Sequence, residues 1–484
     1  MQVLNQALAW ISVSYLGGIP VDRIATIVGV LLAYALAHIF RRIPATNASM
    51  RHMFSIISML FLFGAVQEQY LGLVHLFVGS LVVYFLMATI KGSLMPKVVF
   101  LVAMLHMSYS QLRRQWGETG DQVSFDYTGA QMVFVIKVTS LACCIYDGTC
   151  DPKSLTEYQR KNAVGGVPSF LEFLGYVSFF PGFAVGPAFE LATYRRMIAF
   201  DNAKAHRQIN ARAYTTLLVG VFWLVVYVLY GDKFTYHFMT TEAFAEYGFA
   251  RKTVYLCTSG VVTRAAYYAA WKMSEGACVL AGLGFDGYRE DGSIAWLDIS
   301  NVHVLDVEMG SSLKSLIDGW NVGTNTWLRH HVYLRISPKG KKGSSTRATI
   351  LTFMVSAWWH GFYPGYYLTF LVASLASSAA RILRRNLRPL VVDKEDPKTR
   401  TRAKMAYDLA GWTISKYALD FVVAPFMVLS LSLSLKAWYN NYFLLPIGVA
   451  LVEIAFRVLG AGRYIHAFAS SKAPQNPIDK AKAL

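Results

Sequence analysis

One histidine stands inside a long uncharged stretch of this chain. His360 belongs to the segment SAWWHGFYPGYYLTF, and no Lys, Arg, Asp or Glu occurs in residues 348–380. An ionisable side chain is costly to place in lipid, so its presence in such a sequence indicates a functional role. Gly361, Pro364 and Gly365 follow directly and are expected to break the helix, so that His360 opens onto a cavity. We therefore take His360 as a candidate catalytic base.

A second polar stretch, DGWNVGTNTWLRHHVYLR at positions 318–335, precedes the uncharged one and is too hydrophilic for a plain membrane span. Its Asn321 has both an acceptor and donors, so it could orient His360 or stabilise a developing oxyanion. Each residue has a structural alternative. His360 could pack as a neutral ring among aromatic side chains, and Asn321 could cap a helix or turn. His330 and His331 are expected to form a wet interfacial patch.

Other catalytic signatures are absent from the sequence. It contains no G-x-S-x-G nucleophile elbow, no H-E-x-x-H zinc motif and no glycine-rich phosphate loop. No histidine is followed by Asp five positions later, and the five cysteines show no metal-ligand spacing. A base and amide donors in an apolar chamber suit the transfer of an acyl group from a thioester to an alcohol. This reaction needs no covalent enzyme intermediate and no metal.

The elements that must position these residues are membrane helices. Of the 484 residues, 55% are hydrophobic and only 15% are charged, whereas soluble domains have about 25% charged residues. The sequence predicts an all-α polytopic membrane protein, with about nine to eleven transmembrane or re-entrant helices around an internal cavity. The candidate spans or part-spans lie near 21–40, 53–66, 70–90, 94–110, 129–146, 170–190, 213–231, 253–284, 347–380, 408–435 and 441–460.

The charge pattern also fits a membrane protein. The net charge of +17 comes from 46 basic and 29 acidic residues, and the bases cluster between the apolar runs. Such loops favour the cytoplasmic side. No basic soluble domain is present, so nucleic acid is not an expected partner. The cluster RISPKGKKGSSTR at positions 335–347 lies between the two polar stretches, and its Lys339, Lys341 and Lys342 are candidates for binding an anionic substrate.

The chain is expected to form one membrane-embedded domain, residues 1–470, followed by a disordered cytosolic tail, residues 471–484. No cleavable signal peptide is evident, so internal spans would direct membrane insertion. The tail places Lys482 three and Lys480 five residues from the end. This spacing is typical of a dilysine retrieval signal and predicts a multi-pass protein of the endoplasmic reticulum membrane.

Five stretches occur in an order that resembles a known family. They are DYTGAQMVFVIKVTSLA at 126–142, PSFLEFLGYVSFFPGFAVGPAFELATY at 168–194, YYAAWKMSEGACVLAGLGF at 267–285, WNVGTNTWLRHHVY at 320–333 and SAWWHGFYPGYYLTF at 356–370. As a set they resemble the membrane-bound O-acyltransferases, in the lysophospholipid acyltransferase branch, and are most similar to the fungal broad-specificity members.

The resemblance implies a helical fold that encloses a catalytic tunnel, entered by acyl-CoA from the cytosol and by a lysophospholipid from the bilayer. The family's paired catalytic positions match Asn321 and His360. Acyl-CoA would be a co-substrate, and no cofactor or metal is expected. The basic segment would hold the CoA phosphates through its three lysines. The remaining candidates for substrate binding are Trp320, Trp359, Glu172 and Glu190.

Alternative functions stay open at this point. Other branches of the family acylate a sterol, a diacylglycerol or a protein, and a lipid transporter or scramblase would also carry polar residues within its spans. The stretches DYTGAQM and GPAFELATY favour a lysophospholipid acceptor. The sequence specifies neither the head group, nor the acyl chain, nor the oligomeric state.

Overall fold

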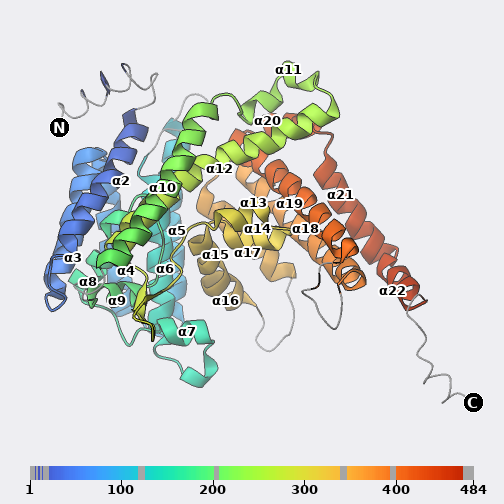
Figure 1. Ribbon diagram of the computed structural model, residues 1–484. Coiled ribbons are helices and arrows are strands. Elements are labelled where there is room, and N and C mark those ends of the chain that lie inside the picture. The colour runs from blue at the N-terminus through green and yellow to red at the C-terminus, as the bar shows by residue number, and fades with distance from the viewer. Residues whose placement is uncertain are drawn as a thin grey trace, which may run out of the picture. The chain divides into compact units, whose positions relative to one another are not determined.

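The computed structural model describes residues 21–117, 126–200, 206–337, 346–392, 399 and 401–471, together with positions 6, 9, 10 and 14. Its regular structure is helical apart from one short hairpin and one isolated bridge (Figure 1). The contacts divide the chain into two units. The larger comprises Met1–Lys233, Val262–Val304 and Gly319–Tyr363, and the smaller comprises Phe234–Val261, Leu305–Asp318 and Pro364–Leu484.

The larger unit contains all the elements that carry the candidate catalytic residues. Its helices are α2 (Val21–Phe40), α3 (Ala48–Met59), α4 (Tyr70–Thr89), α5 (Leu94–Gly117), α6 (Thr128–Asp147), α7 (Glu157–Asn162), α8 (Phe170–Val177), α9 (Leu191–Ile198), α10 (His206–Tyr230), α15 (Val322–Trp327), α16 (Leu334–Ile336) and α17 (Thr346–His360). It also holds the π-helical segments η1 (Leu60–Val66) and η6 (Leu328–Tyr333), and the 3₁₀ turns η2 (Pro152–Ser154) and η3 (Phe180–Gly182). Strands β1 (Phe285–Tyr288) and β2 (Ile294–Trp296) pair antiparallel.

In the described residues of the smaller unit, all regular secondary structure is helical. Helix α12 (Phe249–Leu280) contributes residues to both units. The other elements are η5 (His237–Thr240), α11 (Glu242–Ala245), α13 (Val304–Met309), α14 (Leu313–Gly319), α18 (Pro364–Leu387), η7 (Arg388–Leu390), α19 (Arg402–Val428), α20 (Leu431–Asn440), α21 (Leu444–Glu453), η8 (Ile454–Val458) and α22 (Ala461–Ser471). Trp438 anchors this unit, since its indole stacks on Phe421 and donates a hydrogen bond to the Phe421 carbonyl at 3.2 Å.

Six described helices are long and apolar enough to cross a membrane. They are Val21–Phe40, Ala48–Val66, Tyr70–Thr89, Thr128–Asp147, Arg207–Tyr230 and Pro364–Leu390. The pair Leu431–Asn440 and Leu444–Val458, bent by 81°, adds a seventh if it counts as one broken span. A helical membrane protein is therefore confirmed. Other expected spans differ in form: region 170–190 contains only the short α8 and η3, and the long α12 carries Arg264, Lys272 and Glu275.

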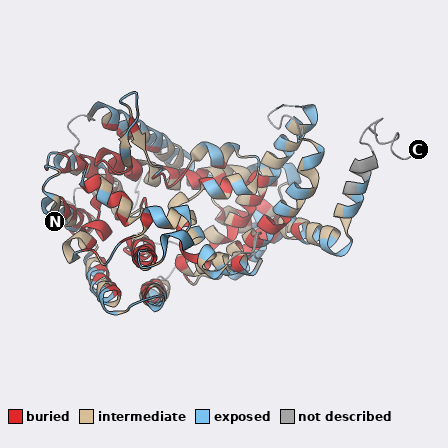
Figure 2. Cartoon of the chain, turned by 90° about the horizontal axis from the view of Figure 1, so that it is seen from below, coloured by how far each residue is buried: buried red, intermediate tan, exposed pale blue. Residues whose placement is uncertain are grey.

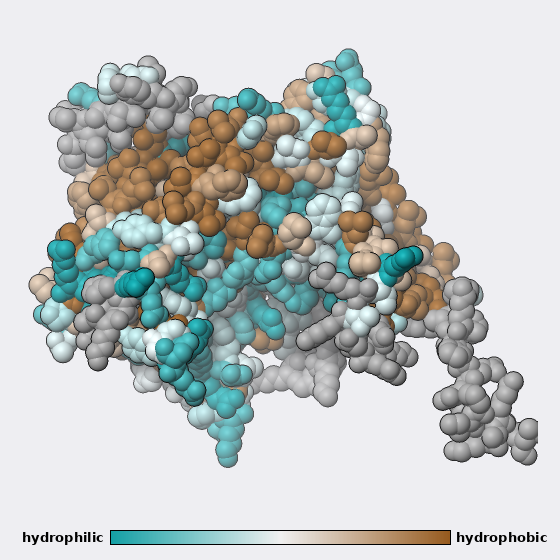
Figure 3. Space-filling view, in the orientation of Figure 1, coloured by the Kyte–Doolittle hydropathy of each residue, from teal (hydrophilic) through white to brown (hydrophobic). Residues whose placement is uncertain are grey.

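Helices α10 and α6 have opposite surroundings within the larger unit. Only 11% of the α10 span is buried, and Leu218 and Phe222 are 68% and 59% exposed. Figure 3 shows apolar side chains gathered over α10, whereas the surface near α7 is hydrophilic. A continuous apolar surface of this kind suits contact with lipid. By contrast, 83% of the α6 span is buried, and many helices in Figure 2 are buried on one side and exposed on the other.

Helix α6 carries one buried cation. Lys137 is fully buried, and its ammonium group donates a hydrogen bond to the Tyr176 carbonyl at 3.0 Å. The Phe189 ring centroid lies 4.3 Å from the same nitrogen. Because an unpaired buried charge is costly, these contacts explain how a lysine is accommodated in an apolar span.

The long uncharged stretch breaks where the sequence predicted. Helix α17 ends at His360, and α18 begins at Pro364. Gly361 has φ +127°, a conformation that other residues rarely adopt. Proline is well suited to the first position of a helix, because the N–H it lacks has no helical partner there. The predicted break beside His360 is confirmed.

Candidate active site

His360 is the last residue of α17, and the residue before it fixes this helix end. The Trp359 indole donates a hydrogen bond to the Met132 carbonyl on α6 at 3.1 Å. The Gln111 side chain on α5 donates to the Trp359 carbonyl at 2.8 Å. The Trp359 and His360 rings meet edge to face, with centroids 4.7 Å apart. Helices α5 and α6 therefore determine where the His360 backbone lies.

Asn321 directly precedes α15 and has an unusual backbone. Its φ and ψ are +44° and +55°, in the left-handed region that asparagine tolerates better than most residues. Asn321 is the N-cap residue of α15, but its side chain makes no capping hydrogen bond to that helix, so the structural alternative holds for its position and not for its carboxamide. The neighbouring Val322 N–H donates to the Asn301 carbonyl at 2.8 Å, which ties this turn to the chain that precedes α13.

A pair of tryptophans connects the two candidate catalytic segments. Trp327, at the end of the helix that Asn321 precedes, lies 6.1 Å from Trp359, measured between ring centroids. Trp327 is 1% exposed, and its indole donates to the Thr139 hydroxyl on α6 at 2.9 Å. Helix α15 is only six residues long, about 9 Å along its axis. The helix that begins after Asn321 and the helix that ends at His360 thus pack together against α6.

Trp320 holds the other side of the Asn321 turn. Its ring centroid lies 4.9 Å from that of Trp271 and 5.5 Å from that of Tyr267, both on α12. Trp320 and Trp359 therefore each have a packing role. Their contact with substrate stays a prediction.

The two glutamates proposed to line the substrate path have different surroundings. Glu172, in the first turn of α8, forms a bidentate ion pair with the partly exposed Arg195, with N–O distances of 2.6 and 3.0 Å. Glu190, just before α9, is largely buried. It accepts a hydrogen bond from the Tyr158 hydroxyl at 2.8 Å and pairs with the His331 ring at 3.0 Å. Glu190 therefore lies within a buried hydrogen-bonded group, and its contact with substrate stays a prediction.

His331 is not part of a wet patch, because its side chain is only 2% exposed. Burial alone would lower the pKa of His331, but the adjacent Glu190 carboxylate raises that pKa to about 10. His330 stacks on Tyr158, with ring centroids 3.7 Å apart. Ligand atoms of Cys144, Glu190 and His331 lie within 4.8 Å of one another, close enough to hold a metal ion. Since hydrogen bonds already satisfy the Glu190 carboxylate, we interpret the group as a buried ion pair.

Comparison with known proteins now decides the family. The sequence profile of the membrane-bound O-acyltransferase family matches residues 114–423, a range that includes Asn321 and His360. The chain belongs to the membrane-bound O-acyltransferase family. The expectation drawn from the five sequence stretches is confirmed.

Curated relatives of this O-acyltransferase cover almost the whole chain. A protein of Schizosaccharomyces pombe named lysophospholipid acyltransferase is 33% identical over 92% of this chain and 87% of its own length. A Saccharomyces cerevisiae protein of the same name is 33% identical over 93% of this chain and 77% of its own length. Human membrane-bound glycerophospholipid O-acyltransferase 2 is 32% identical over 90% of this chain and 85% of its own length.

The basic segment of this O-acyltransferase is only partly visible. Lys339, Lys341 and Lys342 lie outside the described residues. Arg335, at its start, forms a two-pronged ion pair with Asp147 at the end of α6, at 2.7 and 2.5 Å. This contact fixes where the segment begins, and it occupies one of the bases that the sequence grouped with the three lysines.

Several supporting residues were missed from the sequence. Gln111 and Thr139 position the site through hydrogen bonds with Trp359 and Trp327, yet neither was singled out from the sequence. Each is a polar residue within or beside an apolar run, a signal that could have found them. The Glu190–His331 pair joins positions 141 residues apart, so no local pattern in this O-acyltransferase indicates it.

Replacing Glu190 by alanine is expected to lower the free energy of unfolding by about 3–5 kcal/mol, because it leaves the His331 charge buried and unpaired. Denaturation of the detergent-solubilised protein would measure this change. The matched control is Glu172→Ala, which removes a partly exposed ion pair and should cost at most about 1 kcal/mol. A stable Glu190→Ala protein with a raised KM for the acceptor would instead place Glu190 in the substrate path.

Proposed function

We propose that this protein transfers a fatty acyl group from acyl-CoA to the free glycerol hydroxyl of a lysophospholipid, giving a diacyl phospholipid and free CoA. The main support is the pair of fungal relatives named lysophospholipid acyltransferase, which align with 92% and 93% of the chain. The convergence of the Asn321 and His360 segments on α6 also supports the proposal, since the reaction needs a base and amide donors close together.

His360 acts as the general base in this proposal. Its ring accepts the proton of the glycerol hydroxyl while the hydroxyl oxygen forms a bond to the thioester carbonyl carbon. The carbon–sulfur bond then breaks, and the CoA sulfur leaves as the thiol after taking up that proton. Asn321 orients His360 or a substrate, or donates a hydrogen bond to the oxyanion. No protein-bound acyl intermediate is required.

The proposed setting is the endoplasmic reticulum membrane, where the enzyme would remodel phospholipids. The nine to eleven membrane segments stay a proposal, supported so far by six candidate spans in the described residues, or seven with the bent pair that contains α20 and α21. The dilysine spacing of Lys480 and Lys482 supports retention in this membrane. Imaging of protein tagged at the N-terminus and expressed at native level tests this location, and a plasma-membrane pattern would contradict it.

One assay separates the proposed function from its alternatives. Purified protein is incubated with radiolabelled acyl-CoA and, in parallel, with lysophospholipids, a sterol, a diacylglycerol and a serine-containing peptide. We expect label in a diacyl phospholipid only. Label in another acceptor would contradict the proposed substrate. Lipid movement between leaflets without any acyl transfer would favour a transporter or scramblase.

The three lysines of the basic segment are proposed to bind the CoA phosphates. Changing Lys339, Lys341 and Lys342 together to glutamine should raise the KM for acyl-CoA about tenfold, or about 1.4 kcal/mol of binding free energy. The KM for the lysophospholipid should stay nearly constant. Initial-rate kinetics with each substrate varied in turn would measure both values.

The matched control for this triple variant removes three exposed bases at the end of α18, namely Arg381, Arg384 and Arg385. This control should leave both constants unchanged. A raised KM for the lysophospholipid in the lysine variant would show that the segment serves the acceptor or the membrane surface instead.

A further inference from the structure

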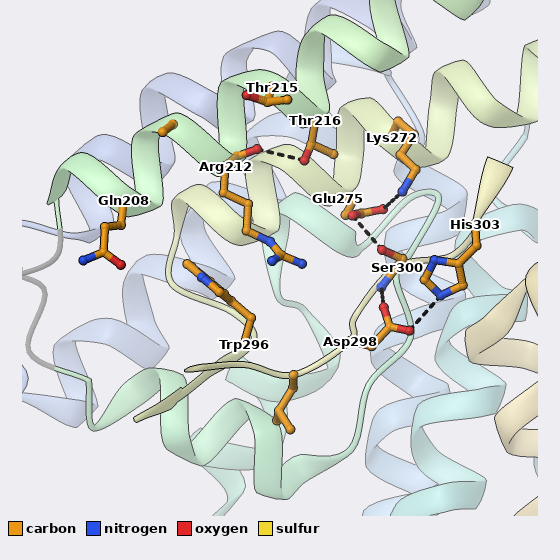
Figure 4. A pocket seen from close by; sticks show the side chains of 12 residues that line it. Gln208, Arg212, Thr215, Thr216, Lys272, Glu275, Trp296, Asp298, Ser300 and His303 are labelled. Atoms are coloured by element: carbon orange, nitrogen blue, oxygen red, sulfur yellow. Dashed lines mark hydrogen bonds and ion pairs between the residues drawn. The ribbon is translucent and has the colours of Figure 1, made fainter. Parts of the chain in front are cut away.

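The larger unit contains a polar cavity of about 750 Å³ that no part of the proposed mechanism uses (Figure 4). Residues of α10 and α12 and the chain that follows β1 form its walls. The hairpin that leads into the cavity is fixed to α10, since the Gln208 side chain accepts a hydrogen bond from the Ile294 N–H at 2.8 Å. A cavity of this size is typical of sites for small molecules or their polar portions.

The cavity wall is joined directly to the turn that carries Asn321. The His303 N–H donates to the Gly319 carbonyl at 2.9 Å, and the Val322 N–H donates to the Asn301 carbonyl at 2.8 Å. Trp271, next to the cavity residue Lys272, packs on Trp320. A polar group bound in this cavity would therefore contact segments that are hydrogen-bonded to, or packed on, the turn that carries Asn321.

Two of the charged side chains in the cavity neutralise each other. The Lys272 ammonium group lies 2.8 Å from the Glu275 carboxylate, and the Ser300 hydroxyl donates to the same carboxylate at 2.8 Å. Glu275 is almost fully buried. This pair is satisfied within the protein, so it contributes little net charge toward a ligand.

Arg212 supplies positive charge on one side of the cavity. Its guanidinium group lies 5.0 Å from the Trp296 ring centroid and extends into the cavity (Figure 4). Among the described parts of the chain, no acidic side chain forms an ion pair with it. A planar guanidinium presents several N–H donors in the geometry that phosphate oxygens accept.

Asp298 supplies negative charge to the same cavity. Its carboxylate accepts hydrogen bonds from the Ser300 N–H at 3.0 Å and the His303 ring at 2.8 Å, yet the side chain remains 52% exposed. Burial would raise the pKa of Asp298, but the hydrogen bonds from His303 and Ser300 outweigh it and lower that pKa. The carboxylate is therefore ionised at neutral pH.

We propose that this cavity binds the head group of the lysophospholipid acceptor and selects a zwitterionic one. The phosphate would contact Arg212, and the ammonium group of an ethanolamine or choline head group would contact Asp298. This inference rests on the proposed function. It explains why one cavity offers both an arginine and an exposed carboxylate beside the Asn321 turn.

The charge balance argues against the nucleotide half of acyl-CoA as the occupant. Arg212 and Lys272 are matched by Glu275 and Asp298, whereas the nucleotide half carries three phosphate groups. An exposed carboxylate would repel such a polyanion, and it would equally disfavour a lysolipid with an anionic head group. A zwitterionic head group can place its phosphate at Arg212 and its ammonium group at Asp298.

The experiment compares purified variants with lysolipids that share one acyl chain and differ in the head group. Asp298→Asn should raise the KM for the ethanolamine and choline forms about tenfold and lower that for lysophosphatidic acid, because the repulsion between its phosphate and the carboxylate is removed. Arg212→Gln should raise the KM for all three forms about tenfold. The KM for acyl-CoA should stay within twofold of wild type in both variants.

Two exposed residues provide matched controls. Asp291→Asn alters the turn of the same hairpin, and Arg207→Gln alters the start of α10, and neither side chain lines the cavity. Both should behave as wild type. A raised KM for acyl-CoA in Arg212→Gln, or an equal rise for every head group in Asp298→Asn, would overturn the proposal.

The head-group preference of the wild-type protein tests the proposal without relying on the folding of any variant. Its kcat/KM should be at least tenfold higher for ethanolamine or choline lysolipids than for lysophosphatidic acid or the inositol form. Efficient acyl transfer with no such preference would overturn the head-group assignment and leave the proposed function intact. Failure to acylate any lysolipid would contradict the proposed function itself.

Discussion

Replacing His360 by alanine is expected to lower kcat by about 10²–10⁴-fold, the usual contribution of a positioned general base. Membrane insertion and expression should stay near wild type, because the hydrogen bonds of Trp359 and Gln111 that hold the end of α17 do not involve the imidazole. Initial rates with saturating acyl-CoA and lysophospholipid would measure the change, normalised to the amount of monodisperse protein.

The matched control for this variant is His38→Ala on α2, whose ring contacts Tyr214 outside the site. It should retain wild-type turnover. If His360 only packs, His360→Ala should express poorly and aggregate in detergent, and the surviving protein should have normal specific activity. A well-folded His360→Ala protein with near-normal acyl transfer would rule out the proposed mechanism.

Replacing Asn321 by alanine is expected to lower kcat by about 10²-fold or more, as removal of an oxyanion donor or an orienting amide does elsewhere. If Asn321 and His360 act as one unit, the double variant should be little slower than the poorer single variant. The same initial-rate assay measures all three proteins.

The Asn321→Gly variant separates the role of the Asn321 carboxamide from the requirement for a left-handed backbone conformation at this position. Alanine is strained at φ +44°, whereas glycine adopts this conformation readily. We expect the glycine variant to be as slow as the alanine variant, because both lack the carboxamide. Recovery of activity in Asn321→Gly would show that this position requires only a left-handed backbone.

Local sequence signals predicted those features of the site that depend only on residues close together in the chain. The break between α17 and α18 follows from Gly361 and Pro364, whose backbone preferences act within a few residues. The hairpin of β1 and β2 could have been found in the same way. Asp291 and Gly292 form an Asp-Gly turn signal between its strands, and Gly292 has φ +76°.

Contacts between distant segments were beyond such reasoning. Glu190 and His331 each fit a solvated position when considered alone, and only the fold shows that they neutralise each other out of water. The contact between Trp327 and Trp359, which brings the two candidate catalytic segments together, likewise depends on packing against α6. The residue types suggested that Asn321 could orient His360, and the resemblance to the family matched both residues to its paired catalytic positions.

The position of His360 at the end of α17 has an electrostatic consequence. The aligned peptide dipoles of a helix place partial negative charge at its C-terminus, which favours a cation there by about 0.3–2 kcal/mol. In the proposed mechanism, His360 is neutral while the substrates bind and becomes an imidazolium only as it accepts the hydroxyl proton. The helix therefore stabilises the reaction's transition state more than its ground state, which is the condition for accelerating a chemical step. In this way the break that ends α17 at His360 also favours the charge that would form there during the proposed acyl transfer.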